Sequence, residues 1–441
     1  MAKKSFKKTI KYILTYTITV TTLFLLLIGT AKIPREKIVE KIKETQECLN
    51  IPNAHADKYI IAGKQYTTTH AYADIMLLNI IYYIDTNNVI PSVMEAKYYS
   101  TNKDKHLEID FSKIIEEGRQ ANVQYMRYWH GSMSIIRPLL MFFNLSQIYI
   151  INAIILTILA VTLLIMLIKT GIKELVIAYI IGLIMCTIIV VPFCLEYFWT
   201  FLIMFIVSII GIILNKKEKN MNTLFLITGI LTCYFDFLTT EIITFLIPII
   251  IILTIRYKQN KTTNFKEGFK FFVISTLFWS LGYIGMWISK WVLASLILKV
   301  NAYDYVINDM KYRINGTGHE QTRTLLKHIP NLPLKAIKIN INTLFAFDIL
   351  KKYDLNKVLP VCLIIAEIVF IRKKEIKKLW FSGLLLIIAI IPYIRYAVLS
   401  SHSFTHNYFT FRSQIVTIMA IILAIVYSVD KNILKKQIKM Q

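Results

Sequence analysis

The amino-acid sequence predicts an all-α protein, a polytopic transmembrane helical bundle with about ten spans, and three observations carry this prediction. Hydrophobic residues make up 56% of the 441-residue chain, more than a soluble domain of this length carries. Apolar stretches comparable to the roughly 20 residues that cross a bilayer recur along the chain. Lysine and arginine gather in alternate connections between these stretches. We therefore expect one integral-membrane domain over residues 1–441.

The spans are expected near residues 12–31, 148–168, 175–193, 198–214, 222–236, 242–255, 271–289, 358–371, 379–394 and 413–428. No small-residue cleavage site follows the first span, so we interpret it as a retained helix rather than a signal peptide. Short cytoplasmic loops collect positive charge. The basic clusters lie near residues 3–11, 169–173, 216–219, 256–266, 372–378 and 435–439. This alternation predicts a multi-pass protein of the cell membrane with both termini in the cytoplasm.

The net charge of +24 is largely accounted for by these clusters, which orient the spans and contact anionic lipids. We therefore expect the lipid bilayer as a partner, and no nucleic acid. Four of the five cysteines lie in or beside predicted spans, and their spacing predicts no disulfide framework.

Two large segments lie outside the membrane on this topology, 34–134 and 300–357, with a shorter loop at 395–412. Residues 34–49 have the pattern of a charged amphipathic helix. Residues 74–84 (DIMLLNIIYYI) are too apolar for a free loop and too short for a span, which predicts an interfacial helix. The segment 135–143 (IIRPLLMFF) is expected to dip into the membrane. All eight histidines fall in these outer segments, so we expect the chemistry there.

Asp74 is the carboxylate that we expect to act as a general base. It begins the predicted interfacial helix, at the depth where a lipid-linked substrate presents its head group. A carboxylate within hydrogen-bond reach can accept the proton of an acceptor hydroxyl. The alternative is that Asp74 caps the helix, because aspartate is a favoured N-cap and suits the positive end of the helix dipole.

Lys290 is expected to bind an anionic phosphate. It lies between Trp287 and Trp291, where the seventh span meets the outer surface. An ammonium group at that depth is costly unless it is paired, and phosphate is a natural partner. The alternative is that Lys290 reaches the interface beside the aromatic belt.

The loop before the last span carries Arg395, His402, His406, Tyr408 and Arg412. The four-residue spacing of the histidines would place both rings on one helix face. Such spacing suits a metal ion, but no carboxylate or cysteine in this loop completes a ligand shell, so we assign no metal ligands. We expect the loop to bind phosphate, with Arg412 donating through its planar fork. The alternative is that the two arginines only mark the membrane border.

A second basic segment, at 127–140, holds Arg127, His130 and Arg137 at the mouth of the second span. Apolar residues flank Arg137 closely, so its guanidinium should face protein or a polar space rather than lipid. Asp236 ends the fifth span on the same side. We leave two interpretations open: a structural ion pair between Arg137 and Asp236, or a contribution of Asp236 to the site.

Four sets of short segments resemble the GT-C glycosyltransferases, and more closely a group of bacterial polytopic membrane proteins related to them. These segments are YWHG with RPLL, YFDFLT, GYIGMW with KW, and HSFTH with FTFR, and they cover about a sixth of the chain. The cytoplasmic amino terminus and the long first outer loop with an acidic residue fit the same architecture. The sequence departs from the family pattern because Asp74 lies about forty residues after the first span and belongs to no doubled acidic motif.

The resemblance implies a membrane glycosyltransferase that moves a sugar from a polyprenyl-phosphate-linked donor to an extracytoplasmic acceptor, a cell-envelope glycan or protein. Asp74 would be its base, and Lys290 and Arg412 would bind the phosphate. A divalent metal ion stays open as a cofactor, and no organic cofactor is expected. The sequence has no phosphate-binding glycine loop, GxSxG elbow or HExxH helix.

Two alternatives remain. One is a transporter or flippase for a lipid-linked glycan, which would need a substrate path that reaches the cytoplasmic side. The other is an outer-face acyl or phospho-group transferase, with His130 or His402 within reach of Asp74 or Asp236.

Overall fold

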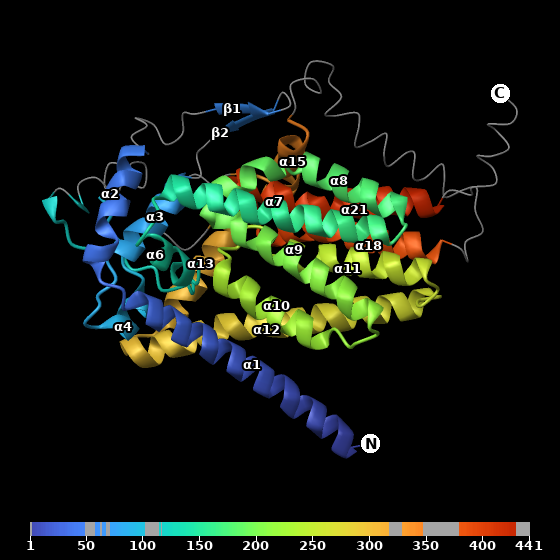
Figure 1. Ribbon diagram of the computed structural model, residues 1–441, viewed down its shortest axis with the longest axis horizontal. Helices are drawn as coiled ribbons and strands as arrows, with labels where there is room; N and C mark the ends of the chain where they lie inside the picture. Colours follow the sequence, from blue (N-terminus) through green and yellow to red (C-terminus); the bar gives the residue numbers. More distant parts are fainter. Residues whose placement is uncertain are drawn as a thin grey trace, which may run out of the picture.

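The computed structural model describes residues 2–48, 58–61, 64–67, 71–101, 114, 115, 117–316, 329–346 and 379–428 (Figure 1). This part of the chain forms 17 α-helices and one antiparallel pair of short strands, β1 (Lys58–Ile61) and β2 (Lys64–Thr67). The predicted all-α class is confirmed for the described residues.

Six helical segments are long and apolar enough to span a membrane, as in a multi-pass membrane protein. They are α1 (Ala2–Ala31), α7 (Leu145–Lys169), α9 (Leu195–Lys216), α12 (Phe265–Leu298), α18 (Trp380–Val398), and the run formed by α20 (Asn407–Thr410), η4 (Phe411–Gln414) and α21 (Ile415–Ser428).

Three of the other expected spans are shorter helices: α8 (Lys173–Met185), α10 (Asn222–Phe235) and α11 (Ile243–Lys258). The expectation of one helix over 175–193 is wrong. Thr187 adopts a left-handed backbone conformation, with φ of 53°, and Pro192 lies in the 3₁₀ helix η2 (Ile188–Phe193) that follows. The expected span at 358–371 lies outside the described residues.

Helix α11 occupies the centre of the bundle. Every residue from Ile243 to Ile255 is buried, and α9, α10, α12, α18 and α21 all contact this helix. A helix that is apolar on all sides lies in a protein core or in lipid. Because neighbouring helices bury α11, its run of isoleucines lies inside the bundle (Figure 1).

Helices α10 and α12 pack with their backbones in close contact. A Cβ atom on Gly229 would lie 2.0 Å from the carbonyl oxygen of Trp279, and one on Gly282 would lie 2.1 Å from that of Leu226. Small residues permit this approach, which increases van der Waals contact between apolar helices.

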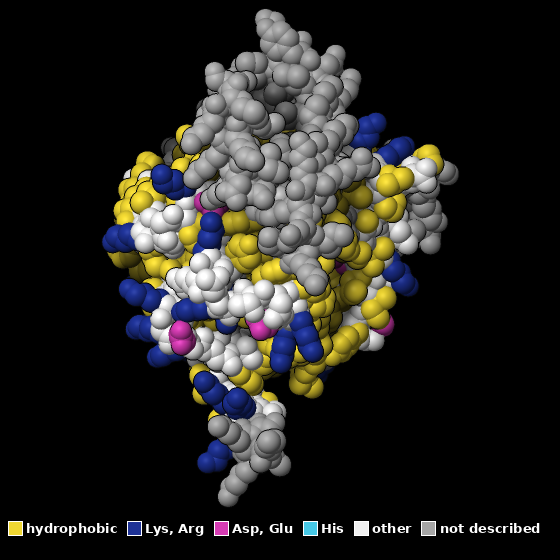
Figure 2. All heavy atoms as spheres, turned by 90° about the vertical axis from the view of Figure 1, so that its right-hand side faces the viewer, with side chains coloured by type: hydrophobic (Ala, Val, Ile, Leu, Met, Phe, Trp, Pro, Cys, Tyr) yellow, Lys and Arg dark blue, Asp and Glu magenta, His cyan; other side chains and the backbone are white. Residues whose placement is uncertain are grey.

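One end of the bundle, which we call the basic end, carries the turns 169–173, 216–222 and 258–265. Lysine and arginine side chains are spread over the part of this end that is coloured in Figure 2, with few acidic ones. Lys258 pairs with Glu174 at 2.6 Å, and Lys261 pairs with Glu218 at 2.9 Å. Three connections far apart in sequence therefore meet here.

The opposite end, which we call the loop end, carries the longer connecting segments. Its helices are α2 (Val39–Cys48), α3 (Ala71–Tyr82), α4 (Val89–Glu95), α6 (Met133–Leu139), α13 (Ala302–Asn315) and α19 (Ser400–Thr405). Helix α15 (Leu332–Leu344) packs against α18, α19 and α20. Helix α3 corresponds to the predicted interfacial helix, but Ile75, Leu78 and Ile81 on it are buried, so α3 packs against protein.

Candidate functional site

Charged side chains buried in the described residues all lie at the loop end. They are Asp74, Arg137, Asp236, Glu241, Lys290, Asp309, Arg395 and Arg412. Burying an unpaired charge is expensive, so each needs hydrogen bonds or an opposite charge. Their partners show which of these charges are satisfied by the described residues and which are not.

Asp74 caps the start of α9. Its carboxylate accepts the N–H of Leu195 at 2.9 and 3.0 Å and the hydroxyl of Tyr149 at 2.6 Å, and the N–H of Glu196 also donates to it. Burial raises the pKa of Asp74 to about 7, and these donors partly offset the effect. Asp74 is therefore a helix cap, but of α9; the structure does not support the expectation that it caps its own helix.

Glu196 is a carboxylate that the sequence reasoning missed. It lies in the first turn of α9 directly after the capped residue, and it is partly exposed. Asp74, Arg313 and Asp236 all act on its charge. No other residue in the described part of the chain donates a hydrogen bond to its side chain. An acidic residue at the start of a long apolar run was the signal that could have identified it.

Arg412 also lies beside the first turn of α9. Its guanidinium is fully buried, 4.4 Å from the ring centre of Tyr197 and 4.7 Å from that of Phe411. Nη1 donates to the carbonyl of Tyr408 at 2.9 Å. Nε and Nη2 have no acceptor within the residues that the structure describes. Because the charge of Asp74 also acts on Tyr197, Arg412 and the two carboxylates gather around one helical turn.

His402 and His406 lie side by side, with ring centres 4.8 Å apart. His406 accepts a hydrogen bond at 3.5 Å from Arg313 through Nε2, so its Nδ1–H donates to the Tyr408 hydroxyl at 3.1 Å. Burial, reinforced by Arg313, lowers the pKa of His406 to about 3 and also lowers that of His402. A ring nitrogen that accepts a hydrogen bond carries no proton, so the His406 ring is neutral. The described residues contain no cluster of three or more side chains suited to a metal ion.

Lys290 forms no ion pair with a carboxylate of the described residues. Its ammonium group donates to the carbonyls of Met94 at 3.0 Å and Val93 at 3.4 Å, and it lies 5.7 Å from the ring centre of Trp129. It thus binds the C-terminal end of α4, where a cation is favoured by the helix dipole. These contacts give Lys290 a structural role.

Arg137 and Asp236 do not pair with each other. Arg137 donates to the carbonyls of Ile33 and Ile81 and so joins the segments that follow α1 and end α3. Asp236 accepts the N–H of Thr239 at 3.1 Å and also its hydroxyl, and it caps the turn before α11. The prediction of a structural ion pair between Arg137 and Asp236 is therefore wrong.

His130 is held by the backbone and by aromatic rings. Its Nε2–H donates to the carbonyl of Tyr125 at 2.9 Å, and its ring lies 5.4 Å from that of Phe237. Burial lowers its pKa to about 3. Neither His130 nor His402 forms a hydrogen bond with Asp74 or Asp236 in the described part of the chain.

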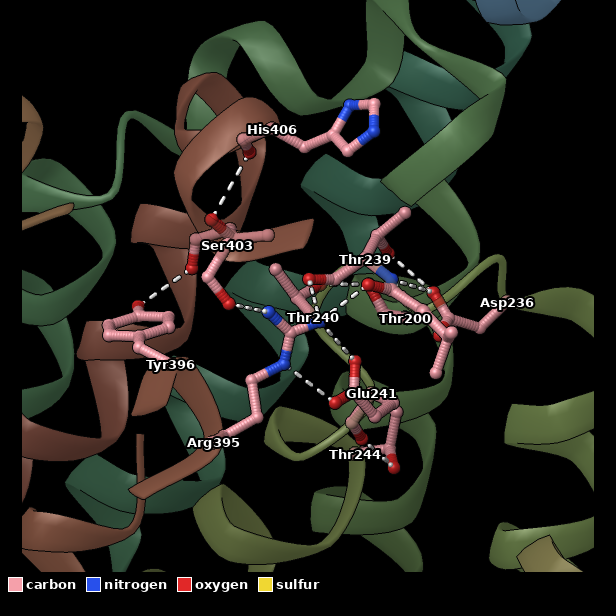
Figure 3. Close-up of polar contacts among 12 residues, drawn as sticks. Thr200, Asp236, Thr239, Thr240, Glu241, Thr244, Arg395, Tyr396, Ser403 and His406 are labelled. Atoms are coloured by element: carbon pink, nitrogen blue, oxygen red, sulfur yellow. Dashed lines mark hydrogen bonds and ion pairs between the residues drawn. The ribbon is translucent and has the colours of Figure 1, made fainter. Parts of the chain in front are cut away.

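Arg395 has a partner that the sequence reasoning did not assign. It donates to both oxygens of Glu241, at 2.8 and 3.1 Å, and to the hydroxyl of Ser403 at 3.1 Å (Figure 3). It also donates to the carbonyl of Leu238, a residue with φ of 63°. This fully bonded arginine ties α18 and α19 to the turn before α11.

A row of charged side chains joins α13 to the histidines. Arg127 pairs with Asp309 at 3.1 Å, and Asp309 lies 3.6 Å from Arg313. Arg313 in turn contacts His406. The row lies at the loop end near the first turn of α9, where the charge of Arg313 acts on Glu196.

The chain was compared with protein-family models, curated proteins and solved structures, and none of them matches. The site is therefore interpreted from its own geometry.

Proposed function

We propose that the protein is a membrane glycosyltransferase of the GT-C type, which moves a sugar from a polyprenyl-phosphate donor to a cell-envelope acceptor. The loop end would face the outside, the basic end and both termini the cytoplasm. About ten spans would cross the membrane, with α8, α10, α11 and residues 358–371 among them. The positive charge on the basic end supports this orientation.

The observation that carries the proposal is the buried guanidinium of Arg412. Two of its three nitrogens, Nε and Nη2, have no acceptor among the described residues, and no carboxylate there pairs with it. A buried cation in this state needs an anion. The phosphate of a lipid-linked sugar would supply one, in the bidentate geometry that arginine favours.

The carboxylates around the same turn supply a base. Three donors surround Asp74, which suits it for holding the start of α9. Glu196 is partly exposed and has no hydrogen-bond donor in the described part of the chain. We therefore assign the base to Glu196 and a positioning role to Asp74. Glu196 would take the proton from the acceptor hydroxyl while the oxygen of that hydroxyl attacks the anomeric carbon of the sugar.

The bond from the anomeric carbon to the phosphate oxygen breaks in the same reaction, and the phosphate leaves with the electron pair. Arg412 would stabilise the negative charge that develops on this leaving group. Preorganised positive charge at such a position lowers the barrier. Lys290 is left out of this step because its ammonium group is bound by the carbonyls of α4.

The centre of the bundle supports an enzyme over a transporter or flippase. The buried part of α11 carries apolar side chains, Pro248 and two threonines, and no charged group. Buried charges in the described residues stop at the loop end. A charged lipid-linked glycan would need polar groups along its path to the basic end. An acyl or phospho-group transferase would need a hydrogen bond from His130 or His402 to Asp74 or Asp236. The described residues form no such bond, so this alternative has no support.

The test is transfer from a panel of radiolabelled polyprenyl-phosphate sugars by the purified protein, with and without a divalent metal ion. We expect Glu196→Gln to lower kcat by about 100-fold or more, as for loss of a general base. Arg412→Gln should lower kcat and weaken donor binding. Glu218→Gln and Arg119→Gln are matched controls, because both residues are exposed and should leave transfer unchanged.

Two results would count against these assignments. Transfer at the wild-type rate by Glu196→Gln would remove the base assignment while leaving the transferase in place. Absence of transfer by the wild-type protein from every donor, combined with movement of the same lipid between leaflets, would favour the flippase.

A further inference from the structure

Helix α13 exposes an apolar stripe. Tyr303, Ile307, Met310 and Ile314 are each between 40% and 49% exposed. Their spacing of four, three and four residues places them on one face of the helix. Four large apolar side chains in a row are unusual on a surface that faces only water.

A neighbouring face of α13 is fixed to the bundle. Ala302, Val306 and Asp309 are buried on it. The hydroxyl of Tyr305 donates to the carbonyl of Gln124 at 3.1 Å, and that of Ser400 donates to the carbonyl of Ile314 at 2.6 Å. These bonds, with the ion pair between Arg127 and Asp309, hold α13 in one orientation. The apolar stripe is therefore presented outward by a docked helix.

The stripe follows the exposed apolar face of α12 along the chain. That face consists of Leu281, Ile284, Ile288, Val292 and Leu296, and Val300 in the connection to α13 extends it. Since α12 is long and apolar enough to span the membrane, its exposed face is the one that acyl chains would contact. The chain turns between the two stripes at Lys299, where the backbone has φ of 54°.

Aromatic residues mark the level of this turn. The rings of Trp287 and Trp291 lie 5.5 Å apart, and that of Trp291 lies 6.4 Å from Tyr303. Tryptophan and tyrosine are enriched at the boundary between acyl chains and head groups. Lys299 and Lys311 are exposed beside the stripe, where ammonium groups can reach lipid phosphates.

We propose that α13 is an interfacial helix whose apolar stripe is embedded in the lipid leaflet at the loop end. Amphipathic helices of this kind lie in the membrane plane with their apolar face at the boundary between head groups and acyl chains. The row formed by Arg127, Asp309, Arg313 and His406 then lies at the level of the lipid head groups. This inference does not depend on the reaction that the protein catalyses.

The test is spin-label accessibility along α13 in phosphatidylcholine–phosphatidylglycerol vesicles. Single nitroxides are placed by Ile307→Cys and Met310→Cys on the stripe, and by Asn308→Cys and Lys311→Cys at exposed positions off it. Cys48 and Cys362 are first replaced by serine, while the three buried cysteines stay. We expect the ratio of collisions with oxygen to collisions with a water-soluble nickel chelate to be several-fold higher on the stripe.

Two outcomes would overturn the proposal. Equal ratios at all four positions would mean that the stripe faces water. Low access to both reagents on the stripe, with spin–spin broadening, would mean that a second copy of the chain covers it. Because the four substituted residues are exposed, the variants should insert normally, which size-exclusion profiles in detergent can check.

Discussion

Asp74 is buried, which raises its pKa, and it accepts hydrogen bonds that favour the ionised form and lower its pKa. Burial has the larger effect on the pKa. The pKa of about 7 means that this carboxyl changes charge near neutral pH. Its contact with Leu195 joins residues 121 positions apart. The stability of the junction between α3 and α9 should therefore depend on pH.

The first prediction concerns Asp74→Asn. The pKa of Asp74 is about 7 in the folded protein against 3.8 ordinarily, so the folded state holds a proton that the unfolded state releases between these values. The stability from this group is complete below about pH 4 and is lost as the pH rises through about 7, at about 1.4 kcal/mol per pKa unit. Wild-type Tm should therefore fall relative to that of the variant between pH 4 and 8.

Tyr149→Phe provides the companion measurement. It removes a donor that favours the ionised carboxylate, so the folded-state pKa of Asp74 should rise further. The loss of stability should begin near pH 4 as in the wild type, but continue to a higher pH and be larger by pH 8. Parallel Tm profiles for wild type and Asp74→Asn across the range would show that Asp74 does not titrate there.

Arg395 and Glu241 form a buried pair whose hydrogen bonds are satisfied on both sides. The second prediction is that Glu241→Gln lowers the free energy of unfolding by about 3–5 kcal/mol, because the arginine is left buried without its counter-charge. The double variant Arg395→Met with Glu241→Met should recover much of this loss. Thermal unfolding in detergent measures both effects.

The exposed pair of Lys261 and Glu218 is the control for this prediction. Glu218→Gln should cost less than about 1 kcal/mol, as for surface ion pairs. A similarly small cost for Glu241→Gln would show that the buried pair does not stabilise the turn before α11.

At the scale of the element, the contact between α10 and α12 depends on two glycines that face each other's helix backbone. The third prediction is that Gly229→Ala destabilises the protein by about 1–3 kcal/mol or more, because the added methyl group would overlap the carbonyl of Trp279. The backbone of α12 cannot move aside as a flexible side chain would.

Gly383→Ala in α18 is the matched control, because a Cβ atom there has no neighbour within 4 Å. It should be neutral, or stabilising by about 0.4–1 kcal/mol through the reduced entropy of the unfolded chain. Equal Tm changes for the two variants would mean that the close approach of α10 and α12 is not required.

At the scale of the whole molecule, charge separates the two ends of the bundle. Lysines and arginines dominate the turns of the basic end, while the buried charges among the described residues gather at the loop end. On the proposed orientation, which follows the positive-inside rule, the basic end faces the cytoplasm.

The fourth prediction tests that assignment with cysteines on exposed residues. In a background without other reactive thiols, Asp85→Cys at the loop end should react with a membrane-impermeant maleimide in intact cells. Lys217→Cys at the basic end should react only after lysis. The reverse labelling pattern would mean that the protein has the opposite orientation in the membrane and that the proposed site faces the cytoplasm.

The sequence predicted the six long apolar helices and placed its two long outer segments at the loop end. Both predictions depend on the composition of stretches of about twenty residues, which does not change with the packing of the helices. The sequence placed Asp74, Arg412, His402 and His406 at that end as well. It did not predict the pair of Arg395 with Glu241, and it did not identify Glu196. It predicted that Lys290 binds a phosphate, whereas the structure shows Lys290 bound to the C-terminal end of α4. It also missed the break at Thr187, a local left-handed turn inside an apolar run.

The sequence by itself determined the class of the protein, the helices apolar enough to span the membrane and the end at which polar residues collect. These properties depend on local composition and on the sign of charge beside each span. Only the tertiary structure decided which charges are satisfied. Arg395 meets a glutamate 154 positions away, and Arg412 lies against Tyr197 of another helix without a counter-charge among the described residues. The partner of a buried charge is fixed by three-dimensional proximity, which no local pattern encodes.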